Sequence, residues 1–304
     1  MFYSIENGKL VEIDTNNFSD GENQHHMGII CYDEIYSTAD SLGVKNKENA
    51  FINHIPRFES HEGFDFICIN YINHDDITAP FNNIYIYFRE NLLLFICDEP
   101  DDVVTIIKDI IDDDIGELNF GRLLCAFFDR MTEKDIHVLE DIEQEISELE
   151  DALITTNKRD CVKEIISLRK RLMILKRYYE HLLEVMDAIA ENENNVLDKR
   201  ALRVFKILYG RIDRLYHSIL NLRDYVTQVR EAYQAEVDIT LNSTMKLFTV
   251  ITAIFLPLTL IAGWYGMNLK MPEYSWGFGY PMVITLSILV IAFCFWIFKK
   301  KKWF

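Results

Sequence analysis

Residues 247–266 read LFTVITAIFLPLTLIAGWYG, and residues 280–298 read YPMVITLSILVIAFCFWIF. Neither stretch contains a charged residue over its 20 and 19 positions, and a helix needs about 20 apolar residues to cross a bilayer. One such stretch would also suit the buried helix of a soluble protein. Two of them, separated by 13 residues and followed by four lysines, predict two membrane-spanning helices near the C-terminus.

The residues beside these stretches predict their orientation. Lys299-Lys300-Lys301-Lys302 follows the second stretch, and basic residues are enriched on the cytosolic side of membrane helices. Two spans would then leave both termini in the cytoplasm, in a multi-pass protein of the cell (plasma or inner) membrane. Aromatic residues that suit the membrane interface gather at the opposite ends of the spans: Trp264, Tyr265, Tyr274, Trp276 and Tyr280.

The rest of the chain has the composition of an acidic soluble domain. The chain holds 31 Lys and Arg and 48 Asp and Glu; residues 241–304 hold six lysines and one acid, so residues 1–240 have a net charge of −22. This charge argues against nucleic acid, which binds basic surfaces, and suits a surface that concentrates cations. Acidity also simply favours solubility. The N-terminus lacks signal-peptide features, and six cysteines without a C-x-x-C pair indicate reduced thiols in the cytosol.

The fold class predicted is an α+β cytosolic domain followed by a long stalk helix and two C-terminal transmembrane helices. Residues 1–130 form the α/β domain, with a hairpin of strands at 84–88 and 92–97, a neighbouring strand at 64–71, and helices at 103–111 and 120–128. Apolar residues at spacings of three and four then predict coiled-coil helices. Residues 131–196 form an antiparallel helical hairpin, which ends at the break Asn192-Glu193-Asn194-Asn195.

The third helix is predicted to run without a break into the membrane. It covers residues 197–265, with the first span at about 245–265, because no Pro or Gly lies between Gly210 and Pro257. Its length is on the order of 100 Å at 1.5 Å per residue, and so long a helix is stable only when it packs on others, which favours self-association around an axis. An outer loop (266–279), the second span (280–298) and a basic cytosolic tail (299–304) complete the chain.

A polar stripe continues the coiled-coil phase into the first span. Its seven positions are Asn242, Met245, Thr249, Thr252, Leu256, Thr259 and Gly263. In lipid, polar side chains must face protein or water, so we predict that the stripe lines a pore. Alternatively, the hydroxyls bond their own i−4 carbonyls or hold helices together. Bulky Met245, Phe248 and Leu256 are predicted to form a hydrophobic gate, and Pro257 permits a bend.

Tyr265-Gly266-Met267-Asn268 follows the first span directly. With Met271-Pro272-Glu273, Trp276-Gly277, Gly279-Tyr280-Pro281 and the terminal lysine run, it resembles the CorA magnesium transporter family. The resemblance is close over about residues 240–304, looser over 60–240 and weak over 1–60. It implies a homopentamer with a funnel-shaped cytosolic domain, a pore lined by the first span, and Gly266, Met267 and Asn268 as a selectivity filter at the outer mouth.

The resemblance implies transport of Mg²⁺, with Co²⁺ or Ni²⁺ as further ions, and no cofactor. Mg²⁺ dehydrates reluctantly, and a ring of Asn268 amides would hydrogen-bond its water shell without stripping it. Glu273 would attract cations to the outer loop, and Lys299 to Lys302 would form a basic collar at the inner end. Two alternatives remain: transport of Zn²⁺ or another divalent ion, against which Met267 argues mildly, and a membrane-anchored coiled-coil scaffold without a pore.

The family's intracellular Mg²⁺ sensor is not expected here, because its acids fall near Ile207 and Ala50-Phe51 in this sequence. Asp213 and Asp224 are possible substitutes. Two further groups contain metal-ligand residue types without a spacing that defines a site: His25-His26, and His74 with Asp75 and Asp76. The sequence has no phosphate loop, Ser-His-Asp arrangement or supported carboxylate pair, so an enzyme is not expected.

Overall fold

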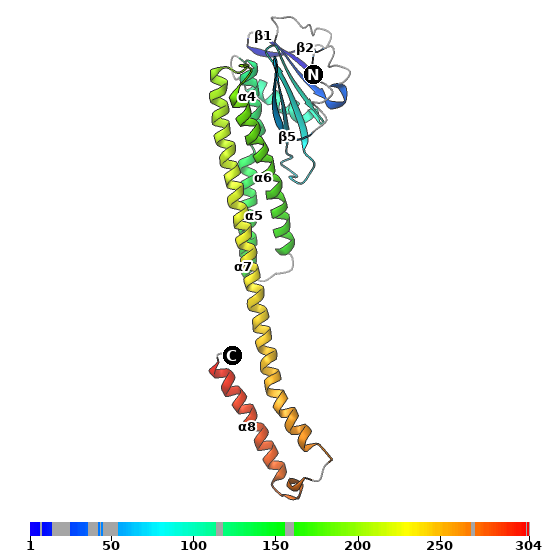
Figure 1. The fold of residues 1–304 in the computed structure, drawn as a ribbon, viewed down its shortest axis with the longest axis vertical. Coiled ribbons are helices and arrows are strands. Elements are labelled where there is room, and N and C mark those ends of the chain that lie inside the picture. Colours follow the sequence, from blue (N-terminus) through cyan, green and yellow to red (C-terminus); the bar gives the residue numbers. More distant parts are fainter. Residues whose placement is uncertain are drawn as a thin grey trace. The chain divides into compact units, whose positions relative to one another are not determined.

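The chain forms two compact units, Met1–Val229 and Arg230–Phe304. The computed structural model describes residues 1–6, 8–13, 25–35, 42, 44, 54–113, 118–155, 161–268, 271–301 and 303, without the side chains at 154, 155, 273 and 274. Helix α7 (Lys199–Tyr265) is continuous and contributes to both units (Figure 1).

A seven-stranded sheet lies at the centre of the first unit, in the order β2-β1-β3-β7-β6-β5-β4. The strands are β1 (Phe2–Glu6), β2 (Lys9–Ile13), β3 (His26–Cys31), β4 (Arg57–His61), β5 (Phe64–Tyr71), β6 (Asn82–Arg89) and β7 (Leu92–Cys97). Strands β3 and β7 pair in parallel, and all other pairs are antiparallel. The predicted β6–β7 hairpin and the neighbouring strand at 64–71 are confirmed.

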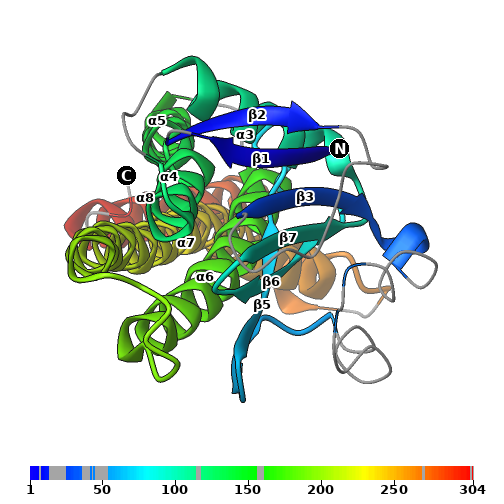
Figure 2. The ribbon, with the colours of Figure 1, turned by 90° about the horizontal axis from the view of Figure 1, so that it is seen from above.

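The central strands are apolar on both sides because both faces of the sheet are covered. Every residue of β7 is buried. One face carries a core that includes Phe66, Tyr85 and Leu94 and extends to Ile35, which follows the short 3₁₀ helix η2 (Tyr32–Glu34). In Figure 2 the helices α4, α5 and α6 lie on the other side of the sheet.

The two predicted helices that follow the sheet are α3 (Pro100–Asp112) and α4 (Phe120–Met131). Asn119 caps α4, since its side-chain oxygen accepts a hydrogen bond of 2.8 Å from the Arg122 backbone N–H. Phe127 of α4 packs on Phe95 of β7 with ring centres 4.7 Å apart. The contact between Phe127 and Phe95 holds α4 against the sheet.

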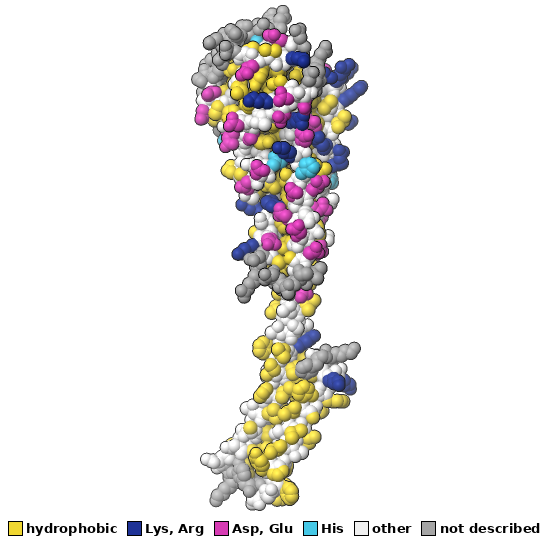
Figure 3. Space-filling view, turned by 180° about the vertical axis from the view of Figure 1, so that it is seen from behind, with side chains coloured by type: hydrophobic (Ala, Val, Ile, Leu, Met, Phe, Trp, Pro, Cys, Tyr) yellow, Lys and Arg dark blue, Asp and Glu magenta, His cyan; other side chains and the backbone are white. Residues whose placement is uncertain are grey.

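Helices α5 (Asp135–Thr155), α6 (Cys161–Glu191) and α7 bury most of the apolar positions at the predicted spacings of three and four, while Leu153 and Tyr233 at the ends of two seams are only partly buried. Ile146, Leu172 and Ile219 are fully buried. Arg171 of α6 joins α5 through two bonds to Glu145, at 3.0 and 2.9 Å. The charged side chains lie on the outer surface of these helices (Figure 3).

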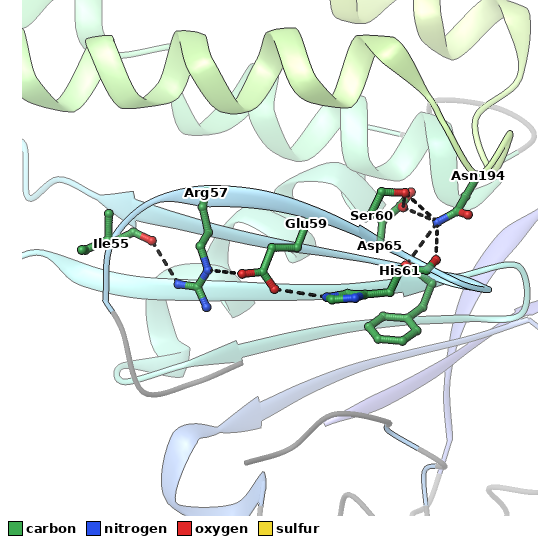
Figure 4. A network of polar contacts seen from close by, with 8 residues as sticks. Ile55, Arg57, Glu59, Ser60, His61, Asp65 and Asn194 are labelled. Carbon is green, nitrogen blue, oxygen red and sulfur yellow. Dashed lines mark hydrogen bonds and ion pairs between the residues drawn. The ribbon is translucent and has the colours of Figure 1, made fainter. Parts of the chain in front are cut away.

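The break between α6 and α7 forms a tight turn that is tied to the sheet. Asn192 and Asn195 both have positive φ, 48° and 54°, which asparagine tolerates better than most residues. The Asn194 amide nitrogen lies 2.6 Å from Asp65 Oδ1, 2.8 Å from the His61 carbonyl oxygen and 3.0 Å from Ser60 Oγ (Figure 4). We call this contact between the turn and the β4–β5 hairpin the Asn194 clasp.

The second unit contains the C-terminal part of α7, the 3₁₀ helix η3 (Pro272–Ser275) and α8 (Gly279–Lys300). Helices α7 and α8 are both long and apolar enough to cross a membrane, and α8 runs back beside α7 (Figure 1). The sides that face each other are the less exposed ones, with Val250 5% and Phe298 8% exposed. Most other side chains of this unit are exposed in the single chain.

Candidate functional site

The polar stripe predicted on α7 lies on the side of the helix that α8 leaves open. All seven of its residues are exposed, Met245 by 63% and Leu256 by 67%. In contrast, Val250 is buried, and Ile254 and Ile261 are partly covered. A single copy of the chain therefore leaves the stripe uncovered, together with apolar side chains beside it such as Phe255 (62% exposed) and Leu260 (66% exposed).

The threonine hydroxyls of the stripe bond the backbone of their own helix. Thr249, Thr252 and Thr259 donate to the carbonyl oxygens four residues earlier, at 2.8, 2.9 and 2.8 Å. The bonding pattern considered as the alternative to a pore is thus present. These bonds use only the hydroxyl protons, so each threonine oxygen can still accept a hydrogen bond through its lone pairs. The stripe consequently offers acceptors at these positions.

A groove of about 770 Å³ follows the outer half of the stripe. Its lining includes Thr252, Leu256, Thr259, Gly263 and Met267. Apart from the helix backbone and the adjoining residues, no atom lies within 4 Å of the position where a side chain at Gly263 would begin, so the groove stays open at this level. The rest of the lining is apolar, with Ile251, Phe255, Leu260 and Trp264, and the groove reaches the Gly-Met-Asn motif at Met267.

The Gly-Met-Asn motif begins where α7 ends. The Gly266 N–H donates to the Ala262 carbonyl at 2.9 Å, and the Met267 N–H donates to Trp264 at 3.4 Å. A Cβ atom at Gly266 would lie 2.8 Å from the Ala262 oxygen, closer than the backbone tolerates, so glycine is required for this helix end. Asn268 follows outside the helix and is exposed, which leaves its amide available to a ligand.

Pro257 does not end α7, which continues to Tyr265. A proline lacks the N–H that would bond the carbonyl four residues earlier, here that of Ala253. In its place, the Cys294 thiol of α8 donates to the Ala253 oxygen, with a sulfur–oxygen distance of 3.7 Å. The sequence pattern did not single out Cys294, since only the packing of α8 on α7 reveals its role.

The residues predicted as gate, basic collar and cation attractor are exposed where the structure describes their side chains. Phe248 is 60% exposed beside the stripe. Lys299, Lys300 and Lys301 are exposed at the end of α8, whereas the structure of Lys302 and the side chain of Glu273 lie outside the described residues. Whether these residues act as gate, collar or cation attractor stays a prediction.

The acids and histidines considered as metal ligands serve local structure. His74 Nε2 pairs with buried Asp135 at 2.6 Å, and Asp76 accepts from the Thr78 hydroxyl and backbone. His25 Nδ1 lies 3.1 Å from the Glu90 carbonyl oxygen, and His26 is buried in β3. Asp213 lies beside His217. Within the described part of the chain, no three His, Cys, Asp or Glu side chains are grouped to hold a metal ion.

Comparison with known proteins agrees with this architecture. The profile of the family described as CorA-like Mg²⁺ transporter protein matches residues 41–300. The chain belongs to the CorA-like Mg²⁺ transporter family. The cobalt/magnesium transport protein CorA of Methanocaldococcus jannaschii is 29% identical over an alignment of 322 positions, which covers 98% of this chain and 97% of that protein. The protein of the same name from Thermotoga maritima is 27% identical over 254 residues, 82% of this chain and 72% of that protein.

The solved structures support the CorA fold over the whole chain. The complete structure of the CorA magnesium transporter from Methanocaldococcus jannaschii superposes with a TM-score of 0.85 and 22% identity. The match covers 100% of this chain and 98% of that one. Family membership and two apolar C-terminal helices make this CorA-family chain a membrane protein.

Proposed function

We propose that this chain forms a channel or transporter for divalent cations, with Mg²⁺ as the main ion and Co²⁺ as a further one. The observation that carries the proposal is the open polar stripe of α7, with α8 on its other side. The magnesium and cobalt transport proteins among the relatives support the choice of ions.

The stripe requires several copies of the chain. Polar side chains inside a bilayer must be shielded from lipid, and the single chain supplies no cover for Thr249, Thr252 or Thr259. Copies arranged around an axis would turn all stripes toward a shared water-filled centre. We propose the pentamer implied by the family, with Asn242 at the inner end and Gly263 at the outer end.

The chemistry of the stripe suits a hydrated cation. Water molecules around Mg²⁺ point their hydrogens outward and need acceptors, and the threonine oxygens have their own protons engaged with the backbone. Mg²⁺ holds its waters tightly, so acceptors that contact the water shell allow passage without dehydration. Met245, Phe248 and Leu256 would close the pore by excluding water.

Asn268 is the proposed filter, at the outer mouth with Gly266 and Met267. Its neutral amide oxygen would bond the water shell of the ion but release it more readily than a carboxylate would. Glu273 would raise the local cation concentration. With both termini in the cytoplasm, an inside-negative potential of 100 mV would drive entry of a divalent ion by about 4.6 kcal/mol, so uptake is the proposed direction.

Ion flux into liposomes tests the proposal. Purified full-length protein is reconstituted with a Mg²⁺-sensitive dye inside, and Mg²⁺, Co²⁺, Ni²⁺ and Zn²⁺ are offered separately and in competition. We expect Mg²⁺ influx that Asn268→Ala reduces by roughly tenfold, since about 1.4 kcal/mol of lost hydrogen bonding corresponds to that factor. Asn221→Ala, on the exposed surface of α7 in the first unit, is the matched control and should leave influx unchanged.

Three results would contradict parts of the proposal. Unchanged influx in Asn268→Ala would remove Asn268 from the filter. A flux of Zn²⁺ greater than that of Mg²⁺ would make Zn²⁺ the main transported ion. A correctly assembled oligomer without any ion flux would support the membrane-anchored scaffold instead.

A further inference from the structure

Four lysines lie at one end of the α7–α8 pair. The Cys294–Ala253 contact sets the register of these antiparallel helices, which rise 1.5 Å per residue. Seven residues further along α8 is Lys301, and seven residues back along α7 is Lys246, so both lie at the same level. Lys299 and Lys300 belong to the same end, where Figure 3 shows dark-blue side chains beside the yellow surface of the pair. We call these four residues the lysine cluster.

The lysine cluster has no acidic side chain paired with it in the part of the chain that the structure describes. Between Asp238 and Glu273 the sequence contains no acid, and none follows Glu273. Among the described residues, no ion pair involves any of the four lysines. Within the described residues, no acidic side chain therefore neutralises this positive charge, and an external anion would lower its energy.

Lys299 and Lys300 point away from α7. The covered side of α8 includes Val290, Cys294 and Ile297, and the helical spacing continues this side to Lys301. Lys300 instead follows Trp296 on the open side, and its Nζ lies 5.3 Å from the centre of the Trp296 ring. Since Trp296 is 60% exposed, this ammonium group sits on the surface of α8 that lipid would contact.

Two tryptophans set the depth at which these lysines lie. The second is Trp303, which folds back onto the end of α8. The backbone N–H of Trp303 donates to the Phe298 carbonyl at 3.1 Å, and the indole ring stacks on the Phe298 ring with centres 5.5 Å apart. Tryptophan prefers the headgroup level of a bilayer. A lysine held against such a ring has its ammonium group at the level of the lipid phosphates.

We propose that Lys299 and Lys300, with Trp296 and Trp303, bind the phosphate of an anionic phospholipid in the cytosolic leaflet. The ammonium groups donate hydrogen bonds to the phosphate, and the indole rings contact the glycerol and upper acyl chain. Lys246 and Lys301 add to the attraction from the α7 side of the same end. The inference rests on the membrane orientation in the proposed function but is independent of ion flux.

Lipid binding to the purified full-length protein tests this site. The protein in neutral detergent is titrated with phosphatidylglycerol or phosphatidylcholine, and the bound lipid is counted by native mass spectrometry. We expect phosphatidylglycerol to be retained preferentially and less so at high salt. Because each lysine near a membrane surface contributes about fivefold in affinity, the double variant Lys299→Gln/Lys300→Gln should bind about 25-fold more weakly.

Matched variants separate this site from general charge effects. Lys299→Arg/Lys300→Arg keeps the charge and should retain the lipid, whereas Lys163→Gln/Lys170→Gln removes two exposed lysines of α6 and should have no effect. If the glutamine double variant does not assemble, Lys300→Gln alone is measured, with an expected loss of about fivefold. Equal retention of phosphatidylcholine, equal loss in the α6 control, or full displacement by inorganic phosphate alone would overturn the proposal.

Discussion

Replacement of Asn194 by alanine is predicted to destabilise the first unit strongly and in a pH-dependent way. The Asn194 amide lies within hydrogen-bond distance of Asp65 Oδ1 (2.6 Å), the His61 carbonyl (2.8 Å) and Ser60 Oγ (3.0 Å). Asp65 is only 4% exposed, so its carboxylate depends on protein donors. The remaining bond to its carboxylate comes from the Ser60 hydroxyl at 3.2 Å.

The magnitude follows from the groups left without a donor. A hydrogen bond to a charged group contributes about 1.5–3 kcal/mol, and one to a neutral carbonyl about 1 kcal/mol. Asn194→Ala should therefore lower the free energy of unfolding by roughly 2–4 kcal/mol. For a unit of this size, Met1–Val229, that corresponds to a fall in Tm of roughly 5–15 °C.

The pH dependence follows from the carboxylate. Burial raises the pKa of Asp65 above its ordinary value of 3.8, while the bonds from Asn194 and Ser60 lower it. Loss of Asn194 raises this pKa further, and a raised carboxylate pKa means that stability is lost as the pH rises through the folded-state value. The penalty of Asn194→Ala should thus be largest at pH 7 and become smaller toward pH 4, as Asp65 takes up its proton.

Thermal unfolding of the full-length protein in detergent, followed at both pH values, measures this effect. Asn221→Ala on the exposed side of α7 is the control and should change Tm little. Asp65→Asn removes the charge and should make the additional penalty of Asn194→Ala independent of pH. A penalty that is equal at both pH values, or a Tm like that of the unaltered protein, would refute this account of the clasp.

Two further substitutions test other contacts. His74→Ala removes one of the partners of Asp135, whose side chain is 1% exposed, and should lower the free energy of unfolding by about 3 kcal/mol. His137→Ala removes an exposed pair with Glu140 and should change thermal unfolding little. An equal loss in both variants would contradict the prediction. Thr252→Val keeps the shape of the stripe but removes a hydrogen-bond acceptor, so Mg²⁺ influx into liposomes should fall. The control Thr285→Val removes the same kind of backbone-bonded hydroxyl from α8 and should leave the influx unchanged.

Local patterns predicted the parts of the fold in which one signal dominates. Strands β6 and β7 are continuous apolar runs around a two-residue turn, and both faces are in fact covered. The seam of α6, from Ile165 to Ile189, is recognisable because its spacing is regular and its residues are buried. The two spans stand out by their length and lack of charge.

Contacts between distant segments were not predictable in the same way. The parallel pairing of β3 with β7 joins residues separated by more than 60 positions, and no local signal specifies it. Asn194 was recognised only as part of a helix break, whereas its partners lie on the β4–β5 hairpin. His74 has the residue type of a metal ligand, and only the fold brings it to Asp135.

Proline in the first span is compensated by a side chain of the second span. Pro257 leaves the Ala253 carbonyl without its usual donor, and an unpaired carbonyl in a bilayer is costly. The Cys294 thiol meets that carbonyl from α8, so the defect lies on the covered side of α7 rather than on the stripe. The stripe can then keep its hydroxyls bonded to the backbone and its acceptors outward. We therefore propose that the side of α7 that α8 leaves open, with these acceptors, faces the pore.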